Sequence, residues 1–217
     1  TPAVLDVSPT AAPFFFFAGV APSTFKELHN AMKRISPPGA MPPKSSITLS
    51  VRTSGQERLE YAMNPECSDG HLIAISEKER LFTHDVRCPA WAADFRLCVS
   101  RERTTAIDAW DPSKWKEFTP KVSRLRQRKS VRVSPLLNAD LSVVRSFTDH
   151  THFEKPWGPQ LRVPLVSAPH VSYDVELEVN MAVLHREVRR TRLLDSTVLH
   201  TAKEVLAFLQ FMAMKRE

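Results

Sequence analysis

Two runs of this sequence carry charges of one sign at every second position. The basic run consists of Arg124, Arg126 and Arg128. The acidic run consists of Asp174, Glu176 and Glu178. Residues i and i+2 of a strand share one face and lie roughly 7 Å apart, so each run predicts a file of like charges along a strand. Such files need compensation, which a divalent cation gives to carboxylates and phosphate groups give to arginines.

The residues between these charges are apolar, as at Leu125, Val175 and Leu177. Alternation with period two recurs in five segments between residues 46 and 180, which predicts strands. If the sheet closes, both charged files point into one lumen while the apolar faces pack outward under helices. We therefore expect an α+β fold, a closed, mainly antiparallel β-barrel with flanking helices. The alternative for the charges is a solvated ladder of cross-strand salt bridges.

Helical patterns flank the strands on both sides. The capping box Thr24-x-x-Glu27 predicts that a helix begins at Thr24, and Pro37 ends the pattern after residue 35. A second helix is expected after Asp195, with one apolar face formed by Val198, Ala202, Val205, Leu206, Leu209 and Ala213. We predict an N-terminal arm over residues 1–22 and a single domain over residues 23–217.

Composition excludes several classes of protein. The 217 residues are 42% hydrophobic and 25% charged with a net charge of +6, which is typical of a folded domain with a modest basic excess. Five glycines and no GxxxxGK[ST] or GxGxxG motif argue against a phosphate-binding glycine loop. Three cysteines without CxxC spacing, and a lone His150-x-His152 pair, predict no zinc site. No apolar stretch is long enough to span a membrane.

The motifs and their order resemble a known family, the metal-dependent RNA 5′-triphosphatases of fungi and protozoa, which are triphosphate tunnel metalloenzymes. The resemblance covers roughly residues 24–214. Five segments carry it in the family's order, namely SITLSVR from Ser46, FRLCVSRE from Phe95, RLRQRKS from Arg124, LNADLSVV from Leu137 and VSYDVELEV from Val171. As in the family, one helix precedes the first of these strands and another follows the last.

The resemblance implies roles for individual residues. Glu176 and Glu178 would hold Mg²⁺ or Mn²⁺, and Asp140 or Asp174 would orient the attacking water. Arginines would neutralise charge on the transferred phosphoryl group. Of these, Arg96 is assigned to catalysis, and the phosphate-binding residues are Arg52, Arg124, Arg126 and Arg128.

This chain departs from the family in the first strand. The family has two metal-binding glutamates there, whereas this sequence has Thr48 and Ser50 and retains only the basic residue, Arg52. In the Asp-Leu-Thr motif, Asn138 replaces an arginine. Neutral hydroxyls are poorer ligands for hard cations than carboxylates, so metal binding is expected to be weakened.

Two functions from different classes therefore stay open. The first is an RNA 5′-triphosphatase that releases the γ-phosphate of triphosphate-ended RNA early in mRNA capping and recruits carboxylates such as Glu57, Glu60 or Glu102. The second is a catalytically silent tunnel-fold homologue that serves as a structural or RNA-binding subunit of a larger assembly. The basic run from His185 to Arg192 is more typical of a solvated face than of an RNA site.

Partners and compartment are expected on the same grounds. RNA is the expected ligand, and the aromatic run Phe14 to Phe17 in the N-terminal arm is a candidate docking segment for a protein partner. The resemblance to capping enzymes implies a nuclear setting. A transit peptide removed ahead of Thr1 would instead imply mitochondria.

Overall fold

A computed structural model gives the architecture of the chain. It describes residues 19–35, 43–53, 57–86, 95–107, 119–148, 150, 160–162, 170–192 and 194–213. The helices are α1 (Pro22–Ile35), α3 (Met181–Thr191) and α4 (Leu194–Ala213). The strands are β1 (Lys44–Thr53), β2 (Glu57–Met63), β3 (Asp69–Val86), β4 (Phe95–Thr105), β5 (Pro120–Arg132), β6 (Leu137–Phe147), β7 (Gln160–Arg162) and β8 (His170–Val179).

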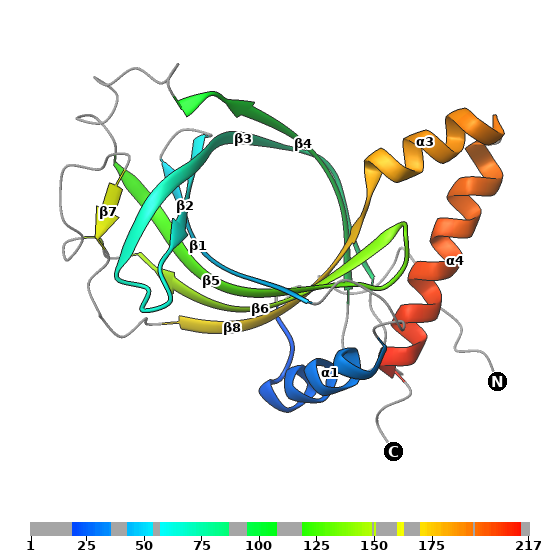
Figure 1. Cartoon of the computed structure of the whole chain (residues 1–217), viewed down its shortest axis with the longest axis horizontal. Coiled ribbons are helices and arrows are strands. Elements are labelled where there is room, and N and C mark those ends of the chain that lie inside the picture. Colours follow the sequence, from blue (N-terminus) through cyan, green and yellow to red (C-terminus); the bar gives the residue numbers. More distant parts are fainter. Residues whose placement is uncertain are drawn as a thin grey trace, which may run out of the picture.

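The strands form one antiparallel sheet that curls around an open centre (Figure 1). Its order is β4-β3-β2-β1-β5-β6-β8, and the short β7 pairs with β3. The five strands predicted from alternation all lie in it. The sequence analysis did not identify β2 and β3, although β3 is the longest strand of the described sheet, with 18 residues.

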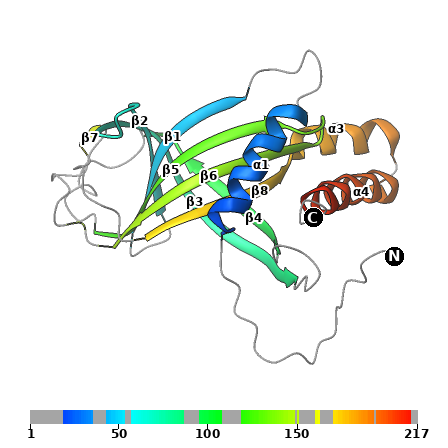
Figure 2. The ribbon, with the colours of Figure 1, turned by 90° about the horizontal axis from the view of Figure 1, so that it is seen from below.

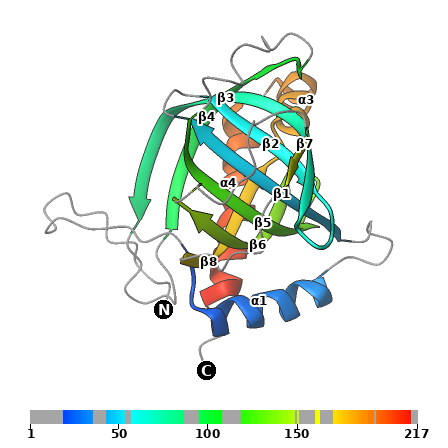
Figure 3. The same cartoon turned by 90° about the vertical axis from the view of Figure 1, so that its left-hand side faces the viewer.

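The sheet is open, which corrects the prediction of a closed barrel. β4 and β8 are edge strands, and in the described part of the chain no backbone pairing joins them. A register shift between Arg80 and Phe82 bends the strand pair β3 and β4. Figure 3 shows the ends of these two strands turning away from the other strands of the sheet. The result is a curled half-barrel.

Apolar side chains lie on the convex side of the curled sheet, as expected from their alternation with charges. One core cluster is formed by α1, α4 and the strands β5 and β6, with Leu28, Met32, Leu141 and Phe208 buried in it. Figure 2 shows α1 lying across the sheet at β6 and β8. A second cluster gathers outward-facing residues of the other strands, including Leu49, Leu59 and Ile75. The concave side is left to the polar residues.

Helix α1 begins at Pro22, two residues before the predicted start. Proline suits the first helical position because its fixed φ matches the helix and its missing N–H would have no partner there. Thr24 therefore lies inside the helix and is not its N-cap. Leu28, Ala31 and Met32, which recur at helical spacing, are buried on one face of this helix.

Helix α4 spans the predicted region but buries a different face. Thr197, Thr201 and Phe208 are buried, whereas Val198 is 47% exposed and Leu206 is 39% exposed. The helix is apolar around most of its circumference, so the sequence alone did not select the face. The buried Thr201 hydroxyl donates to the Thr197 carbonyl at 2.9 Å, which satisfies its polar group within the helix.

The run after the acidic strand is helix α3. Asn180 caps it, with its side-chain oxygen accepting from the Val183 N–H at 3.2 Å. No helix in the described ranges is long and apolar enough to cross a membrane. The predicted docking run Phe14 to Phe17 lies outside the described residues.

Candidate metal and phosphate site

The charged residues of β5, β6 and β8 face the concave side, which we call the lumen. Asp140 of β6 lies directly opposite Glu176 of β8 in the register. On the other side of β5, Thr48 of β1 lies opposite Arg126. Directly paired residues of antiparallel strands share one face, so these side chains line a common surface. The prediction that Arg126, Glu176 and Glu178 share a lumen is confirmed.

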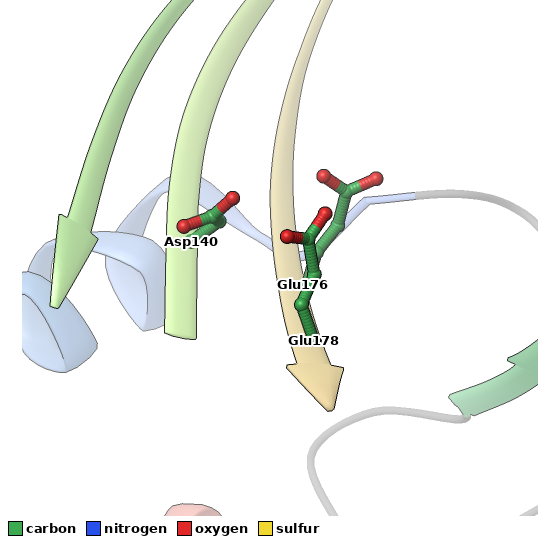
Figure 4. A group of neighbouring side chains, drawn as sticks. All are labelled: Asp140, Glu176 and Glu178. Atoms are coloured by element: carbon green, nitrogen blue, oxygen red, sulfur yellow. The ribbon is translucent and has the colours of Figure 1, made fainter. Parts of the chain in front are cut away.

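Three carboxylates gather at one end of this lumen. Asp140, Glu176 and Glu178 each contribute an oxygen, and these oxygens all lie within 4.8 Å of one another. Figure 4 shows Asp140 on β6 turned toward the two glutamates on β8. We call these three residues the acidic cluster. Asp140, assigned to water orientation in the sequence analysis, is here a third candidate metal ligand.

Two arginines of β5 contact the acidic cluster. Arg128 Nη1 lies 2.9 Å from Asp140 Oδ2 and its Nη2 lies 3.6 Å from Glu176 Oε2. Arg126 Nη1 lies 3.7 Å from the same Glu176 oxygen. Asp140 is 2% exposed. A buried carboxylate needs a cation or hydrogen bonds, and Arg128 supplies the cation beside Asp140.

One member of the acidic cluster, Glu178, has a raised pKa. Burial raises the pKa of Glu178, and the neighbouring Asp140 and Glu176 raise it further. Arg128 and Lys78 oppose this shift of the Glu178 pKa. Lys78 belongs to β3, which lies across the curled sheet from β8 (Figure 1). Crowded carboxylates of this kind favour a bound cation.

A cavity of about 170 Å³ extends from the cluster's arginines along β1, β2 and β5. Its lining includes the hydroxyls of Ser46, Thr48 and Ser50. Five arginines and one carboxylate complete most of its wall, namely Arg52, Arg58, Arg124, Arg126, Arg128 and Glu60. Four of these arginines were predicted or implied as phosphate ligands, and the structure brings those four together.

Arg58 was not singled out from the sequence. It contacts Glu102 of β4, and its Nη2 lies 3.1 Å from Glu60 Oε1. The alternation Arg58-Leu59-Glu60 in β2 could have predicted that Arg58 and Glu60 share one face of a strand, but the segment is short and was not identified as a strand. Glu60 and Glu102, named as carboxylates that the site could recruit, therefore lie on a separate wall around Arg58.

Two predicted catalytic residues lie away from the cluster. Arg96 forms a bidentate ion pair with Asp85, at 2.5 Å for Nε–Oδ1 and 2.9 Å for Nη2–Oδ2. This hydrogen bond from Arg96 lowers the pKa of Asp85. Asp174 lies opposite Ser142 of β6 and accepts a hydrogen bond from the Ser172 hydroxyl at 3.0 Å. Neither residue is among the three clustered ligands.

The donor set of the acidic cluster suits a hard divalent cation. All three groups offer carboxylate oxygens, which Mg²⁺ and Mn²⁺ prefer over nitrogen or sulfur. The Ser142 hydroxyl on the same face of β6 is buried and has no hydrogen-bond partner among the described residues. Adjacent guanidinium groups can bind phosphate oxygens. The lumen therefore combines residues that suit a cation with residues that suit an anion.

Sequence comparisons find no relative for this chain, since neither a family model nor a curated protein matches it. Solved structures do match. The RNA triphosphatase Pct1 of S. pombe is similar at 16% identity and a TM-score of 0.67, over 97% of this chain and 75% of that chain. Pct1 in complex with the Spt5 CTD matches at 16% identity and a TM-score of 0.61, over 94% and 71%.

The triphosphatase of the Mimivirus capping enzyme is a more distant match. Its identity is 14% and its TM-score 0.48, over 82% of this chain and 85% of that chain. The likeness to Pct1 shows that this chain has the fold of an RNA triphosphatase. The resemblance drawn from five motifs in order is confirmed at the level of the fold.

Proposed function

We propose that this protein, which has the fold of the RNA triphosphatase Pct1, binds the triphosphate end of an RNA in its lumen and releases the γ-phosphate. The observation that supports this most is the acidic cluster of Asp140, Glu176 and Glu178 in contact with Arg126 and Arg128. Phosphoryl transfer requires positioning and neutralisation of charge more than covalent chemistry, and this pairing supplies both.

The acidic cluster would hold one Mg²⁺ or Mn²⁺. That ion supplies Lewis-acid stabilisation of negative charge on phosphoryl oxygens. Three carboxylates more than match the charge of a divalent ion, so the cluster fits it without the two glutamates that β1 lacks. The proposed site thus depends on β6 and β8 alone.

The arginines would bind and orient the phosphate chain. Arg126 and Arg128 now contact carboxylates at 2.9–3.7 Å, and phosphate oxygens would take those contacts once a cation neutralises the cluster. Arg52 and Arg124 would bind further phosphates along the cavity. Asp174, on the same strand as the glutamates, would accept a proton from the attacking water. Arg96 would take part only after leaving Asp85.

Metal-dependent phosphate release tests the proposed activity. Purified protein should release phosphate from triphosphate-ended RNA with Mn²⁺ or Mg²⁺ and not with chelator. Glu176→Gln should lower the rate by about a hundredfold or more, because it removes charge stabilisation worth a few kcal/mol. Glu79→Gln is the matched control, since Glu79 pairs with Arg101 and has no part in the cluster.

Equal rates in wild type and Glu176→Gln would contradict the proposal and indicate a contaminant. Release in the presence of chelator would exclude the metal-dependent route. A rate lost equally in Glu79→Gln would point to general damage to the fold.

A catalytically silent, RNA-binding role is the second candidate. The observation that favours it is the presence of Thr48 and Ser50 in the lumen wall, where the resemblance places two metal-binding glutamates. It predicts tight binding of triphosphate-ended RNA without phosphate release at any Mn²⁺ concentration. The same assay, run with a binding measurement alongside, separates the two candidates.

The setting of the protein follows from the proposed activity. An early step of mRNA capping places it in the nucleus, with its 5′-triphosphate RNA as ligand. Pct1 was solved in complex with the Spt5 CTD, and we propose that this chain likewise binds a protein partner, through its N-terminal arm of residues 1–22. Residues 23–217 would act as one domain, and contact between β4 and β8 would close the tunnel around bound RNA.

A further inference from the structure

The cavity in the lumen has two different ends. Arg128 lies at one end, where it is bonded to Asp140 of the acidic cluster. Arg52 lies at the other, four residues along β1 from Thr48. Both arginines line the same cavity, so an extended ligand can contact the acidic cluster and the far end together.

Hydroxyl groups face the arginines at successive positions along this cavity. Arg128 lies opposite Ser46, Arg126 opposite Thr48 and Arg124 opposite Ser50 in the register of β1 and β5. A hydroxyl forms no ion pair with a guanidinium, so β1 leaves the arginine charge available for an anion. The file from Arg128 to Arg124 spans about 13 Å, since a strand rises about 3.3 Å per residue.

Uncompensated positive charge increases away from the acidic cluster. Arg126 and Arg128 are paired with its carboxylates. Arg52 and Arg124 are exposed and form no ion pair within the described ranges. Glu60, the carboxylate that lines this part of the cavity, lies 3.1 Å from Arg58 and is already neutralised.

Unsatisfied donors lie along the same wall. The Nε atoms of Arg58 and Arg126 are buried and have no hydrogen-bond partner among the residues that the structure describes. Buried donors in native proteins are normally paired. An anion in the cavity would accept from them, which is a second indication of a ligand independent of the charge count.

We propose that the lumen holds RNA in one direction. The terminal phosphate lies at the acidic cluster, and the nucleotide-bearing part of the chain runs along β1 and β5 to Arg52 and Arg124. These two arginines bind the phosphates beyond the bond that is broken and make the site selective for a polynucleotide over a short polyphosphate. This inference rests on the proposed function, because it assumes that the terminal phosphate lies at the cluster.

A second exit from the lumen is the alternative direction. Helix α3 begins after Asn180, two residues beyond Glu178, and its exposed surface carries cations that include Arg186 and Arg189. RNA leaving over α3 would contact these residues instead of Arg52 and Arg124. The two directions therefore make opposite predictions for two pairs of arginines.

Binding of two ligands by charge-neutral variants separates the directions. Affinities for an RNA oligonucleotide with a non-hydrolysable, imido-linked triphosphate end and for inorganic tripolyphosphate with the same linkage are measured with Mn²⁺, because the cation neutralises the acidic cluster and the imido bonds prevent hydrolysis. The double variant Arg52→Gln/Arg124→Gln should weaken RNA binding by about tenfold or more, since it removes charge-assisted contacts, and should change tripolyphosphate binding by less than about twofold. The salt dependence of RNA binding should also fall, by a slope of about 0.7 per lost contact.

Two further variants complete the design. Arg126→Gln should weaken both ligands, because Arg126 contacts Glu176 of the acidic cluster. Arg186→Gln/Arg189→Gln on α3 is the matched control and should leave both affinities unchanged. Circular dichroism checks that each variant is folded.

Three outcomes would overturn the inference. Equal loss for RNA and tripolyphosphate in Arg52→Gln/Arg124→Gln would mean that the far end does not distinguish the ligands. Loss of RNA binding confined to the α3 variant would reverse the direction. If wild-type protein bound neither ligand, the proposed function itself would fail, whereas tripolyphosphate binding with no effect of Arg52 and Arg124 would reject the direction alone.

Discussion

Thr48 and Ser50 decide what the wall of the lumen can bind. The register places Thr48 against Arg126 and Ser50 against Arg124. Carboxylates at these positions would pair with the two arginines and reduce the positive charge of the cavity. The absence of the first-strand glutamates thus has a positive consequence, since it leaves an anion site beside a smaller cation site.

A double substitution tests whether the hydroxyls of Thr48 and Ser50 leave the arginines of β5 available to an anion. Thr48→Glu/Ser50→Glu should weaken tripolyphosphate binding by about tenfold or more, because the new anion opposite Arg126 neutralises that arginine and both new anions repel the phosphate groups. Calorimetry gives the affinity, and Thr48→Gln/Ser50→Gln is the control of similar size without charge. An unchanged affinity in the glutamate variant would mean that these side chains do not face the phosphate ligand. Mn²⁺ affinity, measured in parallel, should rise only if the new carboxylates reach the acidic cluster.

Tyr61 carries a buried hydroxyl without a hydrogen-bond partner in the described part of the chain, and burial raises its pKa. Tyr61→Phe should leave the free energy of unfolding unchanged or raise it by about 1 kcal/mol, since it removes an unsatisfied polar group and keeps the ring. Tyr61→Ala should cost about 3–5 kcal/mol through the cavity it leaves in the core. Urea denaturation measures both, and a large loss in Tyr61→Phe would reveal a partner for the hydroxyl.

Sequence patterns predicted residue positions best where charge and burial alternate. Arg126, Glu176 and Glu178 were placed in the lumen because the apolar residues between them require the dry side. Pairings between strands were not predictable in the same way. Asp140 joins the acidic cluster through its register with Glu176, and Arg96 is held by Asp85 across the ribbon of β3 and β4. Both depend on which strands become neighbours.

At the scale of elements, the sequence predicted the existence of strands and helices better than their faces. β2 and β3 were missed because their alternation is short or interrupted, with register shifts between Glu60 and Tyr61 and between Arg80 and Phe82. Closure of the barrel was predicted because it would point both charged files into one lumen, but β4 and β8 stay unpaired in the described sheet. The family resemblance gave the order of elements and not their curvature.

Helix α4 offers a direct test of which face is packed. Phe208 is buried with α1 in the core cluster, whereas Val198, on the face predicted from the sequence, is 47% exposed. Phe208→Ala should cost about 3–5 kcal/mol of stability, and Val198→Ala should cost less than about 1 kcal/mol. Thermal or urea unfolding of both variants measures the difference. Comparable losses would mean that Val198 is covered in solution by a surface outside the described residues.

In the molecule as a whole, the residues that pack the core and the charged residues of the lumen lie on opposite sides of the sheet. Its apolar side chains pack on the convex side under α1 and α4, and its charged groups line the lumen. Substitutions among the exposed lumenal arginines should therefore alter ligand binding with little loss of core packing. The arginines of the lumen repel one another when no ligand is present, so a bound polyanion should stabilise the whole fold.

Tripolyphosphate added with Mn²⁺ should raise the melting temperature of the protein above its value in Mn²⁺ alone. A ligand that binds only the folded state adds about 2.7 kcal/mol at a hundred times its dissociation constant. For a chain of this size each kcal/mol shifts the melting temperature by about 2–4 °C, so a rise of about 5–10 °C is expected. Scanning fluorimetry measures it, with sulfate at the same ionic strength as the control for general salt effects.

A variant in the lumen tests where tripolyphosphate makes its stabilising contacts. Arg126→Gln should remove most of the tripolyphosphate-dependent rise, because Arg126 faces the neutral hydroxyl of Thr48 and lies beside the acidic cluster, where the terminal phosphate is proposed to bind. Arg186→Gln/Arg189→Gln should keep it. A rise of equal size in all three proteins would place the polyanion on the outer surface, where a net charge of +6 attracts it without using the lumen. Loss of the rise in the lumenal variant alone would require the phosphate chain to lie between β1 and β5.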